Sequence, residues 1–290
     1  MRKKPMLAYP VSAKPIDYSK PTFIQPKLDG VRCVIQRESD FPGQEYLASF
    51  SVKAYSRTGK EWKNIDHILK QLYPFFCKYP NVILDGELYN HDLKDDFETI
   101  ISLVRRQKPD DIDMLESANL VQFHCYDIID EELPFDQRIE FVTESLMLLG
   151  NSIHTVYTTK IEESQANIQH QCNLDEGYEG SIVRTNDTYA CKRSHNLRKF
   201  KDFSDAEAYI VGYEEGKGKR AGHLGKFIMQ DEDGNKFGCP PGKGYNYKDM
   251  KDMLENIHEY MGQTATFTYF ERTKAGSYRH PLFKALRNYE

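Results

Sequence analysis

Alternating apolar and polar residues in the first two thirds of the chain predict short β-strands. Residues 31–36 alternate in this way, so one face can be buried while Arg32 faces elsewhere. A strand over 81–89 places Asp85 and Glu87 on one face, because successive side chains of a strand point to opposite sides. Further strands are predicted over 121–129, 181–185 and 198–203.

Apolar residues at helical spacing predict helices between these strands. The spacing i, i+3, i+4, i+7 runs from Ile65 to Leu72 and again from Phe97 to Val104. A third amphipathic stretch runs from Phe135 to Leu146, and Gly150 is placed to end it. Strands and helices mixed in this way predict an α+β domain.

From about residue 203 the pattern changes to short strands joined by glycine-rich turns. One helix is predicted through residues 250–261, with Gly262 as its stop, and Asp233-Gly234 is a hairpin signal. Five or so strands with one helix fit an OB-fold barrel. The boundary is expected near 202–205, which gives domains of 1–202 and 203–290. The strands are predicted over 206–213, 226–231, 235–239 and 264–271.

Composition narrows the class of protein. The chain has 290 residues, a net charge of −5 and six scattered cysteines without a Cys-x-x-Cys pair. We interpret the cysteines as reduced thiols of an intracellular protein. No apolar run approaches a membrane span, and the basic start lacks the apolar stretch of a signal peptide. The acidic balance argues mildly against nucleic-acid binding, but phosphate contact needs only local positive potential, which basic clusters provide unless they are merely solvated faces.

Five short motifs bear on chemistry. Lys27 lies in a Lys-x-Asp-Gly run, which alone is equally well a turn between strands. A nucleophilic lysine needs an unprotonated amine, which a nearby metal ion or cation favours. The other motifs of the chain favour the nucleophile over the turn. Four of them follow in order: Leu84-Asp85-Gly86-Glu87-Leu88, Tyr126-Asp127, Glu179-Gly180-Ser181-Ile182-Val183-Arg184 and Lys199-Phe200-Lys201.

This ordered set resembles the ATP-dependent DNA ligases, covalent nucleotidyltransferases related to RNA ligases and capping enzymes. The resemblance runs from about Ile24 to Arg287, and the size is that of the minimal viral and phage members. It implies an ATP-grasp-like nucleotidyltransferase domain followed by an OB-fold domain. It implies ATP and Mg²⁺ as cofactors and nicked duplex DNA as partner, in DNA replication, repair or recombination. We expect a monomer in the cytoplasm, which is the host cytoplasm for a viral protein, with the nucleus left open.

The resemblance implies roles for the residues around the first motif. Lys27 would attack ATP and carry AMP, and Asp29 would serve the later steps at the nick while also forming a turn. Arg32 would contact the ribose or the nick phosphate. Arg57, in Ser-Arg-Thr-Gly, would bind the 5′-phosphate bidentately.

Two carboxylates match the metal-binding motifs of the family. Glu87 and Glu179 would hold Mg²⁺ directly or through water, although Glu87 binding the ribose is left open. Asp85 matches the scaffold of its motif. Glu176 lies three residues before Glu179, but the spacing Glu-Gly-x-x-x-Arg, which ends at Arg184, selects Glu179.

The remaining roles concern the nucleotide. Tyr126 would stack on adenine, unless it is a core tyrosine, and Ile24 and Gln25 stand where the family reads the base. Lys199 and Lys201 share one face of a strand and would contact the α-phosphate. With only 26 residues before Lys27, ATP rather than a nicotinamide cofactor is the expected donor.

The C-terminal domain matches the family less closely. Arg287 is a counterpart of the last motif, but no aspartate follows it. The run 214–223 is too short to encircle a duplex, and we expect a flexible loop whose cations reach phosphates. Those cations are Lys217, Lys219 and Arg220. An RNA ligase of the same superfamily is the alternative, and a non-catalytic OB-fold nucleic-acid binder is the rival from another class.

Overall fold

A computed structural model describes residues 3–40, 49–94, 96–201, 204–242, 244–269, 272 and 276–287. The chain divides into an N-terminal unit, Met1–Lys201, and a C-terminal unit, Asp202–Glu290. The predicted strand ends 202–203 and 270–271 lie outside the described residues. Among the described residues, no helix combines the length and the apolar character needed to span a membrane.

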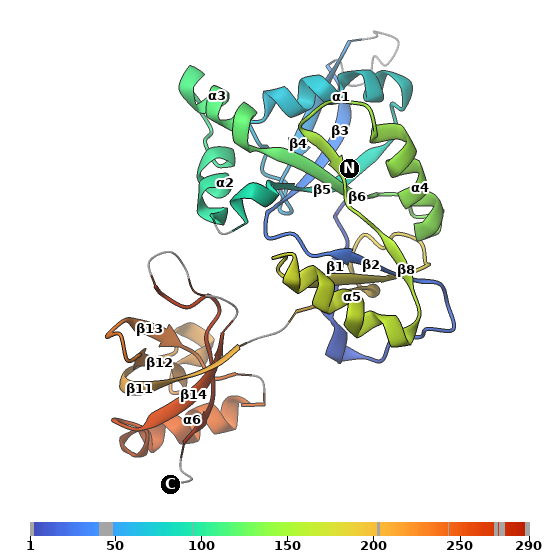
Figure 1. Cartoon of the computed structure of the whole chain (residues 1–290). Coiled ribbons are helices and arrows are strands. Elements are labelled where there is room, and N and C mark those ends of the chain that lie inside the picture. The colour runs from blue at the N-terminus through green and yellow to red at the C-terminus, as the bar shows by residue number, and fades with distance from the viewer. Residues whose placement is uncertain are drawn as a thin grey trace. The chain divides into compact units, whose positions relative to one another are not determined.

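The described strands of the N-terminal unit form two five-stranded sheets. The first sheet has the order β1-β10-β9-β2-β8. Its strands are β1 (Leu7–Pro10), β10 (Arg193–Phe200), β9 (Ser181–Thr185), β2 (Thr22–Pro26) and β8 (Thr159–Ile161). α5 (Glu163–Asp175) packs on this sheet at β2 (Figure 1). β2 lies next to the edge strand β8 and is antiparallel to both β8 and β9.

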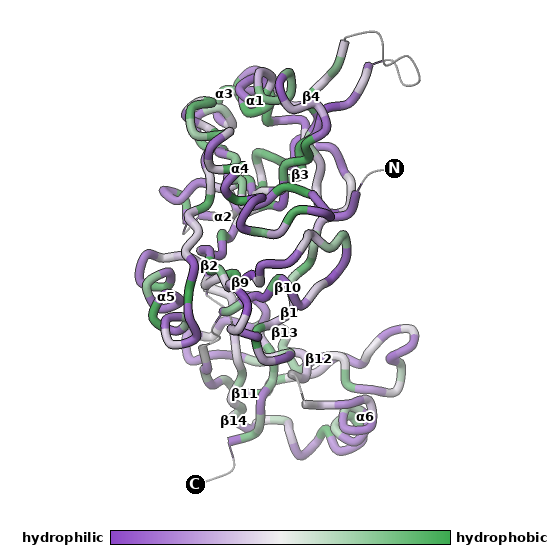
Figure 2. The backbone as a smooth tube through the Cα atoms, turned by 90° about the vertical axis from the view of Figure 1, so that its right-hand side faces the viewer, coloured by the Kyte–Doolittle hydropathy of each residue, from purple (hydrophilic) through white to green (hydrophobic). Residues whose placement is uncertain are grey.

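The second sheet has the order β4-β3-β5-β6-β7 and holds the main core. Its strands are β4 (Phe50–Tyr55), β3 (Val31–Ser39), β5 (Ile83–Tyr89), β6 (Gln122–Ile128) and β7 (Ile153–Thr155). α1 (Asp66–Lys78) packs on β4, and α4 (Phe135–Leu146) on β6 and β7. Apolar positions concentrate along β3 and in neighbouring helices (Figure 2). This core explains why the apolar periodicity of α1, α2 (Phe97–Val104) and α4 predicts their places closely.

Two helices of this unit were not predicted. α3 (Asp111–Leu120) and α5 have no regular apolar stripe: α3 buries Asp113 and Ser117 while its Ile112 and Leu115 are exposed, and α5 is mostly polar. Both begin instead with a capping box, in which two side chains satisfy backbone N–H groups reciprocally. The pairs are Asp110 with Asp113 and Glu162 with Gln165. An acidic residue followed three positions later by an acidic or amide residue was therefore the sequence signal that could have predicted the start of each helix.

The C-terminal unit is a five-stranded antiparallel sheet with the order β13-β12-β11-β14-β15. The strands are β11 (Ser204–Glu215), β12 (Leu224–Gln230), β13 (Lys236–Cys239), β14 (Thr264–Tyr269) and β15 (Leu282–Leu286). Its core contains Phe227, Phe267 and Phe283. This arrangement agrees with the predicted OB-type barrel.

The helix of the C-terminal unit is shorter than predicted. α6 (Tyr247–Glu255) is capped by the side chain of Asn246 and is followed by a separate 3₁₀ turn, Ile257–Glu259. The periodicity continues across the break because Ile257 and Met261 still pack against the core. The hairpin predicted at Asp233-Gly234 is present, with Gly234 at φ 85°.

Candidate active site

Lys27 follows directly after β2, and backbone hydrogen bonds hold it opposite Glu179. The Lys27 N–H donates to the Gly180 carbonyl at 2.9 Å, and the Glu179 N–H donates to the Lys27 carbonyl at 3.1 Å. Gly180 has φ 140°, and a Cβ there would lie 2.5 Å from the Phe200 carbonyl oxygen. Only glycine fits this crossing of strands. The Glu-Gly pair therefore places a carboxylate beside the lysine.

Glu179 pairs with two lysines at once. Its carboxylate accepts from Nζ of Lys27 through Oε2 and from Nζ of Lys201 through Oε1, the latter at 3.1 Å. The Glu179 side chain is only 7% exposed, so water screens these pairs weakly. Burial lowers the pKa of Lys199, and the charges of Lys201 and Lys27 lower it further. Three lysines thus create a positive potential around one carboxylate, as an anion site requires.

Glu87 lies on β5 within electrostatic range of Lys27. Burial raises the pKa of the Glu87 carboxyl to about 7, although the positive charges of Arg32 and Lys27 oppose this rise. The Tyr126 hydroxyl donates to Glu87 Oε2 at 3.3 Å. Glu87 therefore changes its charge near neutral pH, beside the lysine that pairs with Glu179.

Arg32 is held by a buried acid. Its Nε and one terminal nitrogen donate to the two carboxylate oxygens of Asp85 at 2.6 and 2.5 Å. The Tyr189 hydroxyl donates to the same carboxylate at 2.7 Å. Asp85 is fully buried, and this burial raises its pKa. Asp85 accordingly belongs to the scaffold, as its position in the motif predicts, and orients Arg32.

A buried network surrounds the backbone of Tyr126. Gln25 Oε1 accepts from Arg184 Nε at 2.7 Å, and Gln25 Nε2 donates to the Tyr126 carbonyl and to Thr158 Oγ1. Arg184 also donates to Asp127 at 2.6 Å, and Arg138 donates to the same carboxylate at 2.7 Å. Sequence reasoning missed Arg138, because nothing in its helical pattern marks it as the partner of a buried acid.

Two guanidinium groups lie near the Tyr126 ring. Its centroid is 5.1 Å from Arg32 Cζ and 5.5 Å from Arg184 Cζ. The ring packs with the buried cluster of Leu28, Tyr89 and Val156 and is itself partly exposed. This position is compatible with both interpretations of Tyr126, a core tyrosine and a ring that stacks on a base.

Comparison with known families assigns the chain. The family described as ATP dependent DNA ligase domain matches residues 5–201. The chain belongs to this family. The C-terminal residues 215–287 match the DNA ligase OB-like domain, so the OB-type architecture is confirmed as well.

Individual ligases are similar over large parts of the chain. The DNA ligase of African swine fever virus (isolate Pig/Kenya/KEN-50/1950) is 32% identical over 214 residues, which are 69% of this chain and 46% of the viral protein. The DNA ligase of Enterobacteria phage T6 is 24% identical, over 84% of this chain and 58% of the phage protein. The chain spans about half the length of the curated relatives it matches.

Solved structures share the fold. A structure titled as an analysis of Lig E DNA ligases superposes with a TM-score of 0.75 and 22% identity, covering 99% of this chain and all of the other. The ATP-dependent DNA ligase of bacteriophage T7, solved with ATP, gives a TM-score of 0.55 and 20% identity, covering 98% of each chain. The α+β domain followed by an OB-type barrel is thus the fold of a ligase.

Other predicted site residues lie around the cluster or apart from it. Asp29 is half-buried two residues beyond Lys27. The Ile24 side chain is buried against Ile161 and Val183. Its role in nucleotide binding stays a prediction. Glu176 is exposed at the C-terminal cap of α5, away from the paired lysines.

The predicted DNA-contacting residues are exposed in both units. Arg57 is exposed in the turn that follows β4. Lys217, Lys219 and Arg220 are exposed in the hairpin between β11 and β12. Residues Gly218–Arg220 of this hairpin form a 3₁₀ turn, and its flexibility stays a prediction.

Glycines in this hairpin provide left-handed backbone conformations, at φ 62° for Gly218 and 76° for Gly222. The Gly216 N–H also donates to the His223 carbonyl at 2.9 Å, which closes the loop. In the same unit, Arg287 pairs with Glu207 on the sheet. Arg287, the counterpart of the family's last motif, is thus held by Glu207, which the sequence pattern did not single out.

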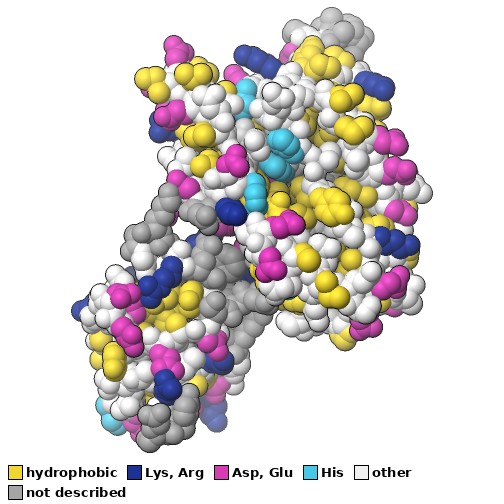
Figure 3. Space-filling model, in the orientation of Figure 1, with side chains coloured by type: hydrophobic (Ala, Val, Ile, Leu, Met, Phe, Trp, Pro, Cys, Tyr) yellow, Lys and Arg dark blue, Asp and Glu magenta, His cyan; other side chains and the backbone are white. Residues whose placement is uncertain are grey.

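Histidines gather on one face of the N-terminal unit beside an apolar patch (Figure 3). The His124 and His154 rings stack at 4.7 Å, and His91 contacts Tyr178 at 4.5 Å. Burial lowers the pKa of His124 to about 3, with a further contribution from the other two histidines. Within the part of the chain that the structure describes, no three His, Cys, Asp or Glu side chains are grouped to hold a metal ion.

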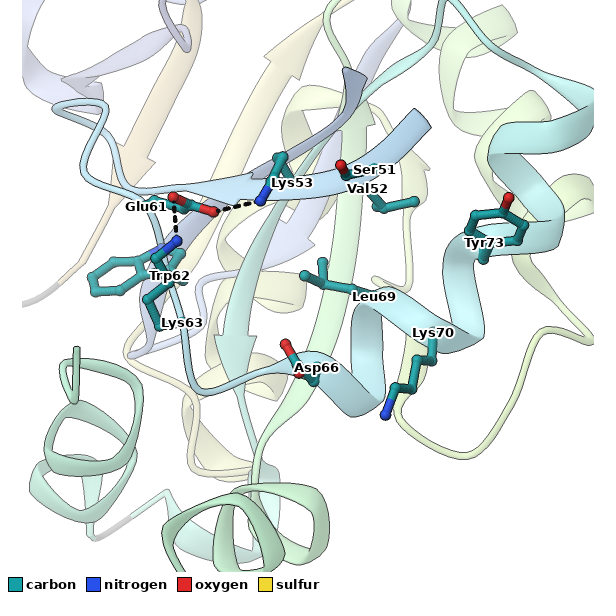
Figure 4. Close-up of a pocket in the computed structure, with 10 residues that line it drawn as sticks. All are labelled: Ser51, Val52, Lys53, Glu61, Trp62, Lys63, Asp66, Leu69, Lys70 and Tyr73. Atoms are coloured by element: carbon teal, nitrogen blue, oxygen red, sulfur yellow. Dashed lines mark ion pairs between the residues drawn. The ribbon is translucent and has the colours of Figure 1, made fainter. Parts of the chain in front are cut away.

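A pocket of about 500 Å³ between β4 and α1 does not contain the predicted site residues (Figure 4). Glu61 pairs there with Lys53 and Lys63, at 3.1 and 2.5 Å. These pairs cancel most of the local charge, and Leu69 and Tyr73 provide an apolar wall. The pocket therefore has no cluster of unpaired cations that would attract phosphates.

Proposed function

We propose that this protein is an ATP-dependent DNA ligase that seals 3′-hydroxyl/5′-phosphate breaks in duplex DNA. The observation that carries the proposal is the cluster of Lys27 and Lys201 on Glu179, with Glu87 nearby, in a member of the ligase family. Binding alone does not require a lysine paired with one partly buried carboxylate and near a second. This arrangement favours an enzyme over a non-catalytic OB-fold binder.

In the first step, Lys27 Nζ forms a bond to the α-phosphorus of ATP. The bond from that phosphorus to the bridging oxygen breaks, and pyrophosphate leaves with the electron pair. Nζ must first lose a proton, because an ammonium group paired with Glu179 has no free lone pair. Lys199 and Lys201 would contact the α-phosphate, where their charges would offset the negative charge of the phosphate oxygens.

Magnesium fits the carboxylates around Lys27. Mg²⁺ prefers oxygen ligands and usually takes one or two protein carboxylates beside phosphates and water. Glu179 and Glu87 provide such oxygens, and each is partly buried with a lysine near it. When bound, the ion stabilises charge that develops on the phosphates. Glu87 binding to the ribose instead remains the alternative for this residue.

The second and third steps move AMP to DNA and then release it. An oxygen of the 5′-phosphate attacks the α-phosphorus of lysyl-AMP, and Lys27 leaves with a proton. The 3′-hydroxyl then loses its proton and attacks the 5′-phosphate, and AMP departs. Asp29 would serve these later steps, Arg57 would bind the 5′-phosphate, and Arg32 would contact the ribose or the nick phosphate.

The adenine would lie against Tyr126, which has a partly exposed ring. Gln25 is only 2% exposed, and its amide nitrogen already donates two hydrogen bonds. Arg184 donates to its carbonyl oxygen and so holds the amide in one orientation. Gln25 would therefore fix the backbone of Tyr126 behind the adenine.

A substrate panel tests the proposal against its rivals. The protein is incubated with magnesium and α-labelled ATP or GTP, then given nicked DNA, nicked RNA or hybrid duplexes. Labelling from ATP followed by sealing of nicked DNA is the expected result. Preferential sealing of RNA would select the RNA ligase instead. Tight binding of DNA without labelling by either nucleotide would select the non-catalytic binder.

A further inference from the structure

Three segments far apart in the sequence meet at a second, cationic pocket of the N-terminal unit. They are the N-terminal residues 3–7, the turn Ser56–Gly59 after β4, and Cys191-Lys192 before β10. The pocket has a volume of about 480 Å³, with Val34 of β3 also contributing. The described residues after the grey N-terminal trace run near β3 in Figure 2, in agreement with this lining.

The charge of this pocket is uniformly positive. Its described lining includes Lys3, Lys4, Arg57 and Lys192, and none of its described lining residues is acidic. Lys3 pairs with Glu131 at 2.9 Å, and both of these side chains are about half exposed. The other three cations have no ion pair among the described residues. A concave surface with unpaired cations attracts a polyanion.

The N-terminal lysines are held in place. The buried Met6 donates its N–H to the Tyr189 hydroxyl at 2.7 Å, and its carbonyl accepts from Arg32 at 3.2 Å. The Leu7 N–H donates to the Lys192 carbonyl at 3.1 Å. Lys4 therefore stands two residues from a fixed point, so binding an anion requires little further ordering of the backbone.

We infer that this pocket, formed by residues 3–7, 56–59 and 191–192, binds internucleotide phosphates of duplex DNA beside the break. This inference rests on the proposed function and extends it, because Lys4 and Lys192 would add backbone contacts next to Arg57. Lys and Arg side chains neutralise phosphates, and the described lining contributes four of them. We place the contact on the DNA backbone, where it positions the duplex and carries no sequence information.

Salt dependence of binding measures these contacts. Each phosphate contact contributes about 0.9 to the log–log salt slope on duplex DNA, so Lys4→Ala/Lys192→Ala should reduce its magnitude by roughly 1.8. The substrate is a nicked duplex, titrated at several salt concentrations with wild-type and variant full-length protein. Both side chains are exposed, so the fold should persist, which the melting temperature verifies.

A matched variant controls for the loss of net charge. Lys70→Ala/Lys160→Ala removes two exposed lysines from α1 and β8 of the same unit. Its slope should stay close to wild type. An unchanged slope in Lys4→Ala/Lys192→Ala, or an equal loss in both double variants, would overturn the inference.

A nick with a 5′-hydroxyl distinguishes the two sources of phosphate. If the contacts are internucleotide, the slope difference persists on this substrate. If it disappears, the pocket binds only the terminal phosphate and the inference is wrong. Labelling by α-labelled ATP is measured in parallel and should be unchanged in the variant. If the wild-type protein is not labelled by ATP, the proposed function is contradicted. The salt slopes test the pocket separately.

Discussion

At the scale of single residues, the arrangement around Glu179 explains why its neighbour Glu176 is a poor substitute. Both acids lie close together in sequence, but only Glu179 is placed against Lys27 by the backbone bonds between β2 and β9. The motif spacing Glu-Gly-x-x-x-Arg predicted this choice. The pairing of Arg32 with Asp85 was not predicted, because the sequence pattern does not show that their strands β3 and β5 are neighbours.

The first prediction compares the two acids directly. Glu179→Gln should lower the single-turnover rate of adenylylation by at least about 10²-fold, the scale of one preorganised electrostatic group. Glu176→Gln, at an exposed position, should stay near wild type. Rapid-quench labelling with α-labelled ATP gives both rates. A severe loss in the Glu176 variant alone would reverse the assignment of the motif.

The second prediction concerns Glu87 and pH. Burial raises its pKa from 4.5 to about 7, so the folded protein favours the protonated acid. The stabilisation from this protonation is fully present below pH 4.5 and is lost as pH rises through about 7. Melting temperatures of wild type and Glu87→Gln, without nucleotide, should therefore shift in favour of the variant over this window. A difference that is constant with pH would show that Glu87 titrates normally.

At the scale of elements, strands that do not follow one another are joined by buried polar side chains. Arg184 of β9 contacts Gln25 of β2 and Asp127 of β6, and so links both sheets of the N-terminal unit. Apolar periodicity predicts α1 and α4, which pack on a sheet through one stripe. It cannot predict α5, which is started by its capping box and has few buried residues.

The third prediction tests this link. Arg184→Met leaves the buried Asp127 with Arg138 alone and removes the donor to Gln25. Breaking a buried ion pair in this way costs about 3–5 kcal/mol of the free energy of unfolding. Urea denaturation measures the loss. Arg193→Met, at an exposed residue of the adjacent strand β10, is the control and should cost far less. Equal losses in the two variants would contradict a special role for the network.

At the scale of the whole molecule, the two units differ in the sequence patterns that predict their structure. The C-terminal unit follows simple alternation, and its barrel was predicted from strand spacing and the Asp233-Gly234 turn. The 3₁₀ turn at Gly218–Arg220 was not predicted, because glycine-rich runs read equally as flexible loops or as turns with left-handed residues. Cations are displayed on both units.

The fourth prediction asks whether the hairpin of the C-terminal unit binds DNA. Replacing Lys217, Lys219 and Arg220 with alanine should weaken binding to a nick. It should also flatten the log–log salt slope by roughly 0.9 for each phosphate that the variant no longer neutralises. These side chains are exposed, so stability should be unaffected. Filter binding at several salt concentrations provides the measurement. Unchanged affinity and salt dependence would exclude the hairpin from the DNA interface.

The most direct test of the central claim is covalent labelling of Lys27. Wild-type protein incubated with magnesium and α-labelled ATP should acquire one acid-labile AMP, and mass spectrometry of the digested protein should locate it on Lys27. Lys27→Ala should not be labelled, and Lys27→Arg should fail as well, because a guanidinium group stays protonated. AMP attached to any other residue, or labelling that survives in Lys27→Ala, would contradict the account.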